Sequence, residues 1–381
     1  MTLPNQRSLF DIPDEVAYLN CAYMSPLLNA ARDAGQAGVA RKSQPWRITS
    51  EDFFTGSERA RGLFAQLIGG NADGVALIPS ASYGTAIAAA NLPLAPGQRI
   101  IVLDEQFPSN VYIWHELAAR MQAEVIVVPR PEDFDWTTPL LERIRTLDER
   151  TAIVAVPECH WTDGSLIDLA QVGEQARSVG AALVVDATQS LGAYPFDVNA
   201  IRPDFLIAAA YKWLLGPYSM GFLYAAPQRR SGRPLEHNWI AREGSENFAG
   251  LVNYRDTFQQ GARRYDVGEL SNFALMPVVI AALEQLLAWN VSEIAATIGE
   301  LTGVVERSSR ELGLHPVSAS RRVPHMIGVR SPHPLPPNLP ALLAAEKVYV
   351  SLRGQSIRVS PHVYNTSQDV DRLVAALRAS L

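Results

Sequence analysis

Short runs of apolar, often β-branched residues alternate with amphipathic segments between residues 74 and 224. The apolar runs predict strands at residues 75–78, 99–103, 124–128, 152–156, 182–185 and 205–209. Helices are predicted between them at residues 110–121, 139–147 and 169–179. Strands that alternate with helices are typical of a parallel sheet covered on both faces. Because such sheets bind ligands at the carboxyl ends of their strands, the residues that follow each strand are candidates for a functional site.

The alternation ends in a polar stretch at residues 228–261, which we interpret as loops over the site and the approach to a second domain. A strong helix is predicted at residues 276–289, with Pro277 near its first turn. Short strands are then predicted in four segments, HPVSAS, HMIGVR, KVYVSLR and SIRVSPH, and a final helix at residues 367–377. The pattern therefore predicts an α/β protein with a large domain at residues 21–262. A smaller α+β domain at residues 263–381 would be completed by residues 1–20.

Composition indicates an ordinary globular enzyme. With 381 residues and 48% hydrophobic content, the chain is long enough for two packed domains. The formal net charge is −6 without a block of like charge, so nothing indicates a nucleic acid or an anionic membrane as partner. We see neither a leader-like N-terminus nor an apolar stretch of bilayer length, and we expect a cytoplasmic protein. Cys21 and Cys159 lack the paired spacing of metal ligands, so no metal site is expected.

One primary amine, Lys212, lies where the apolar run DFLIAAAYK meets a turn rich in Gly and Pro. A buried amine is costly unless it has a chemical role. Asp186 ends another apolar run, ALVVD, and Gln189 follows it closely. Pyridoxal 5'-phosphate (PLP) requires a lysine that forms a Schiff base with its aldehyde and a carboxylate that faces its ring nitrogen. A solvated lysine and a helix-capping aspartate are the ordinary alternatives for each residue alone, but the combination favours a PLP site.

Each of these residues has a definite role in such a site. Lys212 would bond to the cofactor and then, once freed by substrate, move the α-proton as a desolvated base of low pKa. Asp186 would keep the ring nitrogen protonated, so that the ring accepts electrons from the substrate α-carbon. Gln189 is placed to donate a hydrogen bond to the ring hydroxyl.

Three segments resemble the successive signatures of class V aminotransferase-fold enzymes, namely DATQSLGAYPFDV, DFLIAAAYKWLLGP and SIRVSPHVYNTSQDVDRL. This group includes cysteine desulfurases, kynureninases and isopenicillin N epimerase-like proteins. The resemblance runs from about residue 18 to the C-terminus. It implies a PLP-dependent enzyme of fold type I, with a mainly parallel sheet of the seven-stranded type in its large domain. It also implies a homodimer whose sites lie at the subunit interface.

The resemblance assigns further residues to the cofactor. The segment PSASYGTAI places Ser82 and Tyr83 between a strand and a helix, where free backbone N–H groups bind phosphate readily. Family positions imply that Ser82 and Tyr211 contact the phosphate and that Phe107 stacks on the pyridine ring. Trp161, in the segment CHWTDG after a predicted strand, is expected to line the pocket.

The residues that bind the substrate are expected mainly near the C-terminus. Arg358 matches the family arginine that grips a substrate carboxylate, since a guanidinium fork meets a carboxylate with two hydrogen bonds. Arg353, in SLRGQ, is a secondary candidate. His160 and Asn20 are further candidates for substrate contact. An α-amino acid or a keto acid follows as the substrate.

Two departures from the family pattern narrow the interpretation. Cysteine desulfurases need a thiolate on a loop before the C-terminal arginine, and residues 350–356 contain no cysteine, so a persulfide-forming desulfurase is rejected. In YDVGELSN, Gly268 is followed by Glu269, where relatives have a Gly-Thr pair that reaches the neighbouring subunit's phosphate. Ser271 or Asn272 are candidates to replace that contact.

We expect a PLP-dependent class V aminotransferase that acts on an amino acid. A lyase that eliminates at Cβ, including C–S lyases, and an epimerase remain open, because all three begin with the same proton abstraction. A non-catalytic PLP-fold binding protein is the alternative from another class, and the intact set of Lys212, Asp186 and Gln189 argues against it. A dinucleotide-binding oxidoreductase lacks its G-x-G-x-x-G phosphate loop here.

Overall fold

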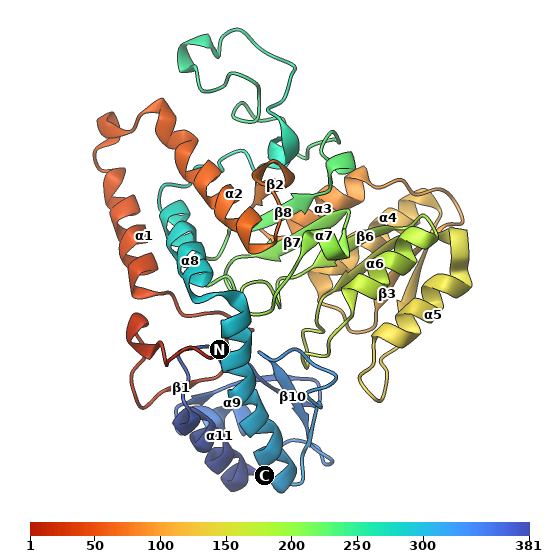
Figure 1. Ribbon diagram of the computed structural model, residues 1–381, viewed down its shortest axis with the longest axis vertical. Helices are drawn as coiled ribbons and strands as arrows, with labels where there is room; N and C mark the ends of the chain where they lie inside the picture. Colours follow the sequence, from red (N-terminus) through yellow and green to blue (C-terminus); the bar gives the residue numbers. More distant parts are fainter.

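A seven-stranded sheet forms the centre of the larger part of the molecule in the computed structural model, which describes all residues from 1 to 381 (Figure 1). The strand order is β2-β8-β7-β6-β5-β3-β4. The strands are β2 (Val75–Ile78), β3 (Arg99–Leu103), β4 (Glu124–Val128), β5 (Thr151–Pro157), β6 (Ala182–Asp186), β7 (Phe205–Ala209) and β8 (Gly221–Ala225). Neighbouring strands from β7 to β4 are parallel, whereas β8 is antiparallel to both β2 and β7.

All six predicted strands of this sheet are confirmed, but β8 was not predicted. β8 follows the Gly/Pro-rich turn after Lys212 with only eleven residues between it and β7, too few for a helical crossover. The chain therefore returns antiparallel to β7 and inserts between β7 and β2.

Helices cover both faces of the sheet, because alternate residues of each strand point to opposite faces and both sets are apolar. One face packs against α3 (Ala81–Asn91) and α4 (Tyr112–Met121). The other packs against α2 (Thr55–Leu67), α5 (Thr137–Leu147), α6 (Leu169–Ser178) and α8 (Leu275–Trp289). The short α7 (Val198–Ile201) lies beside α6, and α1 (Asn29–Arg41) packs on α8.

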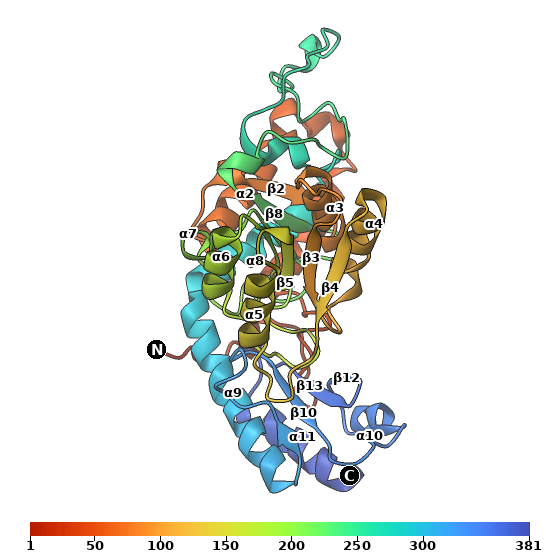
Figure 2. The ribbon, with the colours of Figure 1, turned by 90° about the vertical axis from the view of Figure 1, so that its right-hand side faces the viewer.

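A smaller part with its own core lies below the large sheet (Figures 1 and 2). It contains an antiparallel sheet of order β12-β13-β10-β9 and a separate parallel pair, β1-β11. The strands are β1 (Ala17–Tyr18), β9 (His315–Pro316), β10 (Ile327–Arg330), β11 (Val348–Tyr349), β12 (Ser351–Arg353) and β13 (Ser356–Val359). The helices are α9 (Val291–Glu311), α10 (Leu339–Ala345) and α11 (Ser367–Ser380). The exact domain boundary at residue 262 remains a prediction; α8, which follows it, packs beside the large sheet on α1 and α2.

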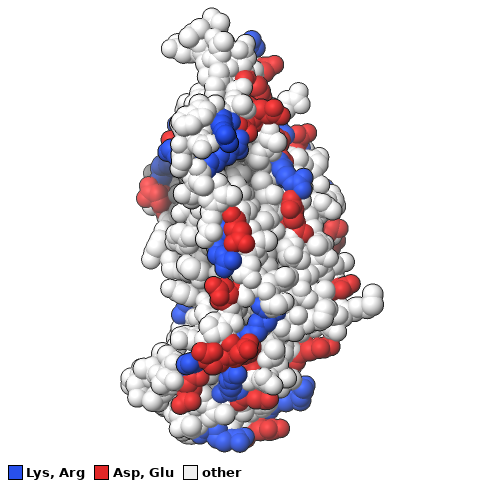
Figure 3. Space-filling view, turned by 90° about the vertical axis from the view of Figure 1, so that its left-hand side faces the viewer, with Lys and Arg blue, Asp and Glu red and all other residues white.

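Two surface features bear on function. Loops were predicted to cover the site at residues 228–261. Residues 237–257 of this stretch project away from the body instead, and no residue of the stretch lines the cavity described below (Figure 2). Within one chain, that prediction is therefore wrong. On the face shown in Figure 3, basic and acidic side chains are interspersed.

No single helix is long and apolar enough to cross a membrane; α8 and α9 pass that test only together, as a pair bent by 79°.

Candidate active site

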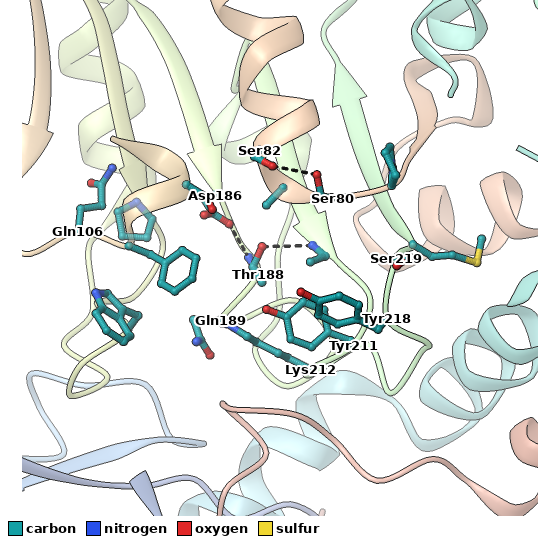
Figure 4. Close-up of a pocket in the computed structure, with 18 of the residues that line it drawn as sticks. Ser80, Ser82, Gln106, Asp186, Thr188, Gln189, Tyr211, Lys212, Tyr218 and Ser219 are labelled. Carbon is teal, nitrogen blue, oxygen red and sulfur yellow. Dashed lines mark hydrogen bonds between the residues drawn. The ribbon is translucent and has the colours of Figure 1, made fainter. Parts of the chain in front are cut away.

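A cavity of about 280 Å³ lies at the carboxyl ends of the strands of the large sheet. Its walls come from segments that follow β2, β3, β5, β6 and β7, as expected for this type of sheet. Seven predicted site residues line it: Ser82, Phe107, Trp161, Asp186, Gln189, Tyr211 and Lys212. Figure 4 shows the two serines of the α3 N-terminus at one side of the cavity and Lys212 at the other.

Lys212 is placed by the turn that follows β7. Its side chain is 5% exposed, and Nζ lies 5.2 Å from the ring centroid of Phe107 and 5.4 Å from that of Tyr211. Burial, and next the positive charge of Arg358, lower the pKa of Lys212 to about 8, although Asp186 opposes this shift. The amine is therefore available as the free base close to neutral pH, which a nucleophile or proton acceptor requires.

Asp186 is the last residue of β6, and its carboxylate is held by the next turn. Oδ1 accepts a hydrogen bond from the Thr188 N–H (3.0 Å), and Thr188 Oγ1 accepts one from the Ala209 N–H at the end of β7 (3.1 Å). Burial raises the pKa of Asp186, while the hydrogen bonds from Thr188 and the charge of Lys212 act against it. Oδ2 makes no hydrogen bond within the chain, so it is free to accept one from a cationic ring nitrogen.

The side-chain amide of Gln189 is held between two partners of opposite polarity. Oε1 accepts a hydrogen bond from Trp213 Nε1 (3.0 Å), and Nε2 donates one to the carbonyl oxygen of Ala22 (3.1 Å). A flipped amide would lose both bonds, so its orientation is determined. The second hydrogen of Nε2 remains for the cavity. Gln189 is therefore a hydrogen-bond donor there, as its predicted contact with a ring hydroxyl requires.

We expect Trp213→Phe to destabilise the protein by about 1–3 kcal/mol, because the buried Gln189 Oε1 loses its donor. Urea unfolding of the cofactor-free protein measures the change. Trp136→Phe is the matched control, since Trp136 is equally buried and its indole N–H has no partner. Equal losses in the two variants would mean that only the size of the ring matters.

The N-terminus of α3 forms the end of the cavity that suits a phosphate. Ser80 caps the helix by accepting a hydrogen bond from the Tyr83 N–H (3.2 Å), and Ser82 Oγ lies 2.9 Å from Ser80 Oγ. The first N–H groups of a helix lack partners within it and bind phosphate readily. This geometry suits the role predicted for Ser82. The phenol of Tyr83, in contrast, lies beside Glu236 and outside the cavity lining, so the cofactor contact predicted for Tyr83 has no support in its position.

Aromatic rings line the remaining wall. Phe107 and Trp161 meet edge to face, with centroids 5.4 Å apart and an interplanar angle of 83°. Trp161 Nε1 donates to the carbonyl oxygen of Glu105 (2.7 Å), which fixes the indole. Tyr211 packs against Tyr218 with centroids 4.7 Å apart. Such apolar faces exclude water and suit a planar heterocycle, in keeping with the stacking role predicted for Phe107.

Arg358 and Asn20 belong to one hydrogen-bonded chain next to the cavity. Arg358 Nη1 donates to the carbonyl oxygen of Trp161 (2.8 Å), and Nη2 lies 3.4 Å from Ser351 Oγ. Ser351 in turn donates to Asn20 Oδ1 (2.8 Å). Neither Arg358 nor Asn20 is among the cavity-lining residues. Asn20 is therefore connected to Arg358 only through Ser351, and the substrate contact predicted for Asn20 has no support here.

His160 is a structural residue of the loop that carries Trp161. Its ring stacks on Trp136, with centroids 4.9 Å apart. Its nitrogens are hydrogen-bonded to Thr162 Oγ1 (2.7 Å) and to the carbonyl oxygen of Asp104 (3.0 Å). The side chain is fully buried, and burial lowers its pKa. Since both nitrogens are occupied, the substrate role predicted for His160 has no support in the structure.

The segment at residues 265–272 is held within its own chain. Asn272 Oδ1 accepts two backbone N–H groups at the start of α8, and Ser271 Oγ is hydrogen-bonded to the carbonyl oxygen of Phe53. Glu269 is exposed. A contact from Glu269, Ser271 or Asn272 to a neighbouring subunit remains a prediction, as does the homodimer itself.

Several cavity residues were not predicted: Gln106, Ser109, Thr188, Tyr218 and Ser219. Thr188 is the most informative of them, because it ties Asp186 to the end of β7. Because Thr188 lies in the sequence between Asp186 and Gln189, which were both assigned to the site, the sequence offered a signal that Thr188 also belongs to it. Tyr218 and Ser219 lie in the turn between β7 and β8, which could not be placed before β8 was known.

Comparisons with known proteins agree with this geometry. The class V aminotransferase family matches residues 47–373. The chain is 28% identical to YcbU, an uncharacterized aminotransferase of Bacillus subtilis (strain 168), over 94% of this chain and 91% of that protein. It is 27% identical to isopenicillin N epimerase from Streptomyces clavuligerus, over 84% of this chain and 83% of the relative. Other relatives are named cysteine desulfurase and kynureninase.

The fold is also that of a solved structure, a C-DES mutant with glycine covalently linked to its PLP cofactor. The TM-score is 0.89 at 18% sequence identity, over 99% of this chain and all of the other. The predicted α/β fold with a smaller second part is thereby confirmed.

This chain belongs to the class V aminotransferase family, and it is a PLP-dependent enzyme. The residues that line the cavity fit this cofactor. Lys212 offers an amine to the aldehyde, Asp186 an unpaired oxygen to the ring nitrogen, and the α3 N-terminus its N–H groups to the phosphate.

Proposed function

We propose that the enzyme is an aminotransferase that acts on an amino acid, with Lys212 as the residue that bonds to the cofactor. The observation that carries this proposal is the buried amine of Lys212, with its pKa lowered to about 8, in the same cavity as the Asp186 carboxylate. PLP, when bound, supplies the electron sink that makes the α-proton of an amino acid removable. The chain supplies the rest: attachment, orientation and a base.

Lys212 Nζ would take the proton from the substrate α-carbon and deliver it, on the same face, to the cofactor carbon that had carried the aldehyde, which is the proton shift that transamination requires. Asp186 Oδ2 would hold a proton on the ring nitrogen, and Gln189 would donate its remaining N–H to the ring hydroxyl. Phe107 and Trp161 exclude water from the reacting atoms. Arg358 orients the substrate through its carboxylate.

Transfer is favoured over epimerisation because Lys212 is the only amine in the cavity lining. Inversion with two bases needs a second proton-transfer group on the opposite face. The other ionisable lining groups, apart from Asp186, are Cys159, Tyr211 and Tyr218, and burial raises the pKa of the first two. Burial also raises the pKa of Cys21, so neither thiol is a ready thiolate for sulfur transfer.

Single-turnover product analysis of the holoenzyme tests the proposal. We expect one equivalent of 2-oxo acid per site without free ammonia, because the amino group stays with the enzyme. Release of ammonia together with the 2-oxo acid would indicate elimination instead. Incorporation of solvent deuterium into an amino acid of inverted hand would indicate epimerisation.

The pKa of Lys212 also sets the pH dependence of cofactor uptake. The neutral amine is the nucleophile, and a pKa lowered to about 8 means that its fraction rises with pH up to that value and then levels off. We expect the rate of PLP uptake by the apoenzyme, followed by visible absorbance, to rise about tenfold per pH unit from pH 6 to 7 and to flatten above about 8.5. A rise that continues to pH 10 would indicate an unperturbed lysine.

A further inference from the structure

Two arginines of the small sheet, Arg353 on β12 and Arg358 on β13, carry positive charges that no carboxylate of this chain neutralises. Neither forms an ion pair with Asp or Glu, although Arg358 is only 1% exposed and Arg353 is half-buried. The Nε atom of each is buried and has no hydrogen-bond partner. Because an unpaired buried charge is costly, such a pair indicates a site for an anionic ligand.

The strand register places both guanidinium groups on one face of the sheet. Arg358 pairs with Ser351 and Arg353 pairs with Ser356, so the two arginines are diagonal neighbours, roughly 7–8 Å apart at the backbone. Both contact Trp161: Arg358 through the hydrogen bond to its carbonyl oxygen, and Arg353 with Cζ 5.3 Å from the ring centroid. Trp161 lines the cavity and neither arginine does, so both arginines lie next to the cavity, in contact with this lining residue.

With the phosphate of the cofactor assigned to the N-terminus of α3, two arginines face a substrate that has at least one carboxylate. Lys212, Arg353 and Arg358 are positive, and the two arginines both lower the pKa of Lys212. Asp186 is the only carboxylate in the lining, and the proposed function assigns it to the ring nitrogen. One substrate carboxylate occupies one arginine and leaves the other unpaired.

We propose that the substrate is an amino acid with an acidic side chain, a 2-amino dicarboxylic acid, whose α-carboxylate binds Arg358 and whose side-chain carboxylate binds Arg353. Arg353 is the more exposed of the two and therefore takes the part of the substrate nearer the opening. This inference rests on the proposed function for the identity of the reacting group, but the pairing of two carboxylates with two arginines stands on the contacts above.

Substrate pairs that differ only in charge test the inference. With the holoenzyme, we expect kcat/KM to be at least about tenfold higher for glutamate than for glutamine, or for aspartate than for asparagine. In Arg353→Gln the same ratio should fall to within about threefold of one. Arg321→Gln is the control, since Arg321 belongs to the same part of the molecule but pairs with Asp133 and Asp135. Equal use of acid and amide by the wild-type enzyme, or an unchanged ratio in Arg353→Gln, would overturn the inference.

A binding measurement separates this inference from the proposed function. We expect calorimetry on the holoenzyme to give at least about tenfold tighter binding of glutarate than of valerate, and Arg353→Gln should remove the difference. If that pattern holds without transfer of any amino group, the acidic-ligand site stands and the aminotransferase fails. If neutral amino acids are transaminated and glutarate binds no more tightly than valerate, the aminotransferase stands and the acidic-ligand site fails.

Discussion

Replacing Lys212 with alanine is expected to lower turnover by at least about 10³-fold, because the chain loses both its point of attachment and its proton carrier. No other amine lines the cavity. Steady-state rates of the cofactor-saturated variant, together with its visible absorbance, measure the effect. Turnover within about tenfold of the wild type would remove Lys212 from the mechanism.

The chain contains three lysines, Lys42, Lys212 and Lys347, which makes the attachment site easy to test. Borohydride reduction of the holoenzyme followed by peptide mass spectrometry should place the cofactor on Lys212. Lys347→Ala is the matched control, since Lys347 is exposed and pairs only with Glu15. Label on Lys42 or Lys347 would contradict the assignment even if Lys212→Ala were inactive.

Replacing Arg358 with glutamine is expected to lower kcat/KM by on the order of 100-fold, because two charge-assisted hydrogen bonds to the substrate carboxylate are lost. The loss should fall mainly on KM, since the carboxylate is bound equally in the ground state and the transition state. Measurement of both constants with the best amino acid substrate checks this. A fall in kcat alone would mean that Arg358 acts by holding the loop of Trp161 instead.

Arg358→Lys separates the effect of the two-hydrogen-bond geometry of the guanidinium group from the effect of its positive charge. Lysine keeps one positive charge but cannot form two parallel hydrogen bonds, so an intermediate loss in kcat/KM is expected. Because Arg358 is fully buried, the urea midpoint of each variant must be measured beside its kinetics. A variant that loses activity only in proportion to its unfolded fraction would contradict the binding role.

Local pattern predicted the strands of the large sheet and the chemistry at their ends. Short apolar runs rich in β-branched residues favour strands, and all six predicted strands were found. Residues that follow parallel strands meet at one edge of the sheet. For that reason Lys212, Asp186 and Gln189 could be assigned to one site from their positions alone, and the structure brings them together.

Side-chain direction and long-range pairing were decided only by the tertiary structure. Tyr83 lies in the first turn of α3, which turns its phenol toward Glu236, and stacking on Trp136 holds His160 away from the cavity. Strand β8 and the partners of Gln189 depend on contacts between residues far apart in the sequence. The sequence by itself thus determined six of the seven strands and the cofactor class, because these follow from local hydrophobicity and residue type. The unpaired arginines beside Trp161 became visible only once packing had shown which charges have partners.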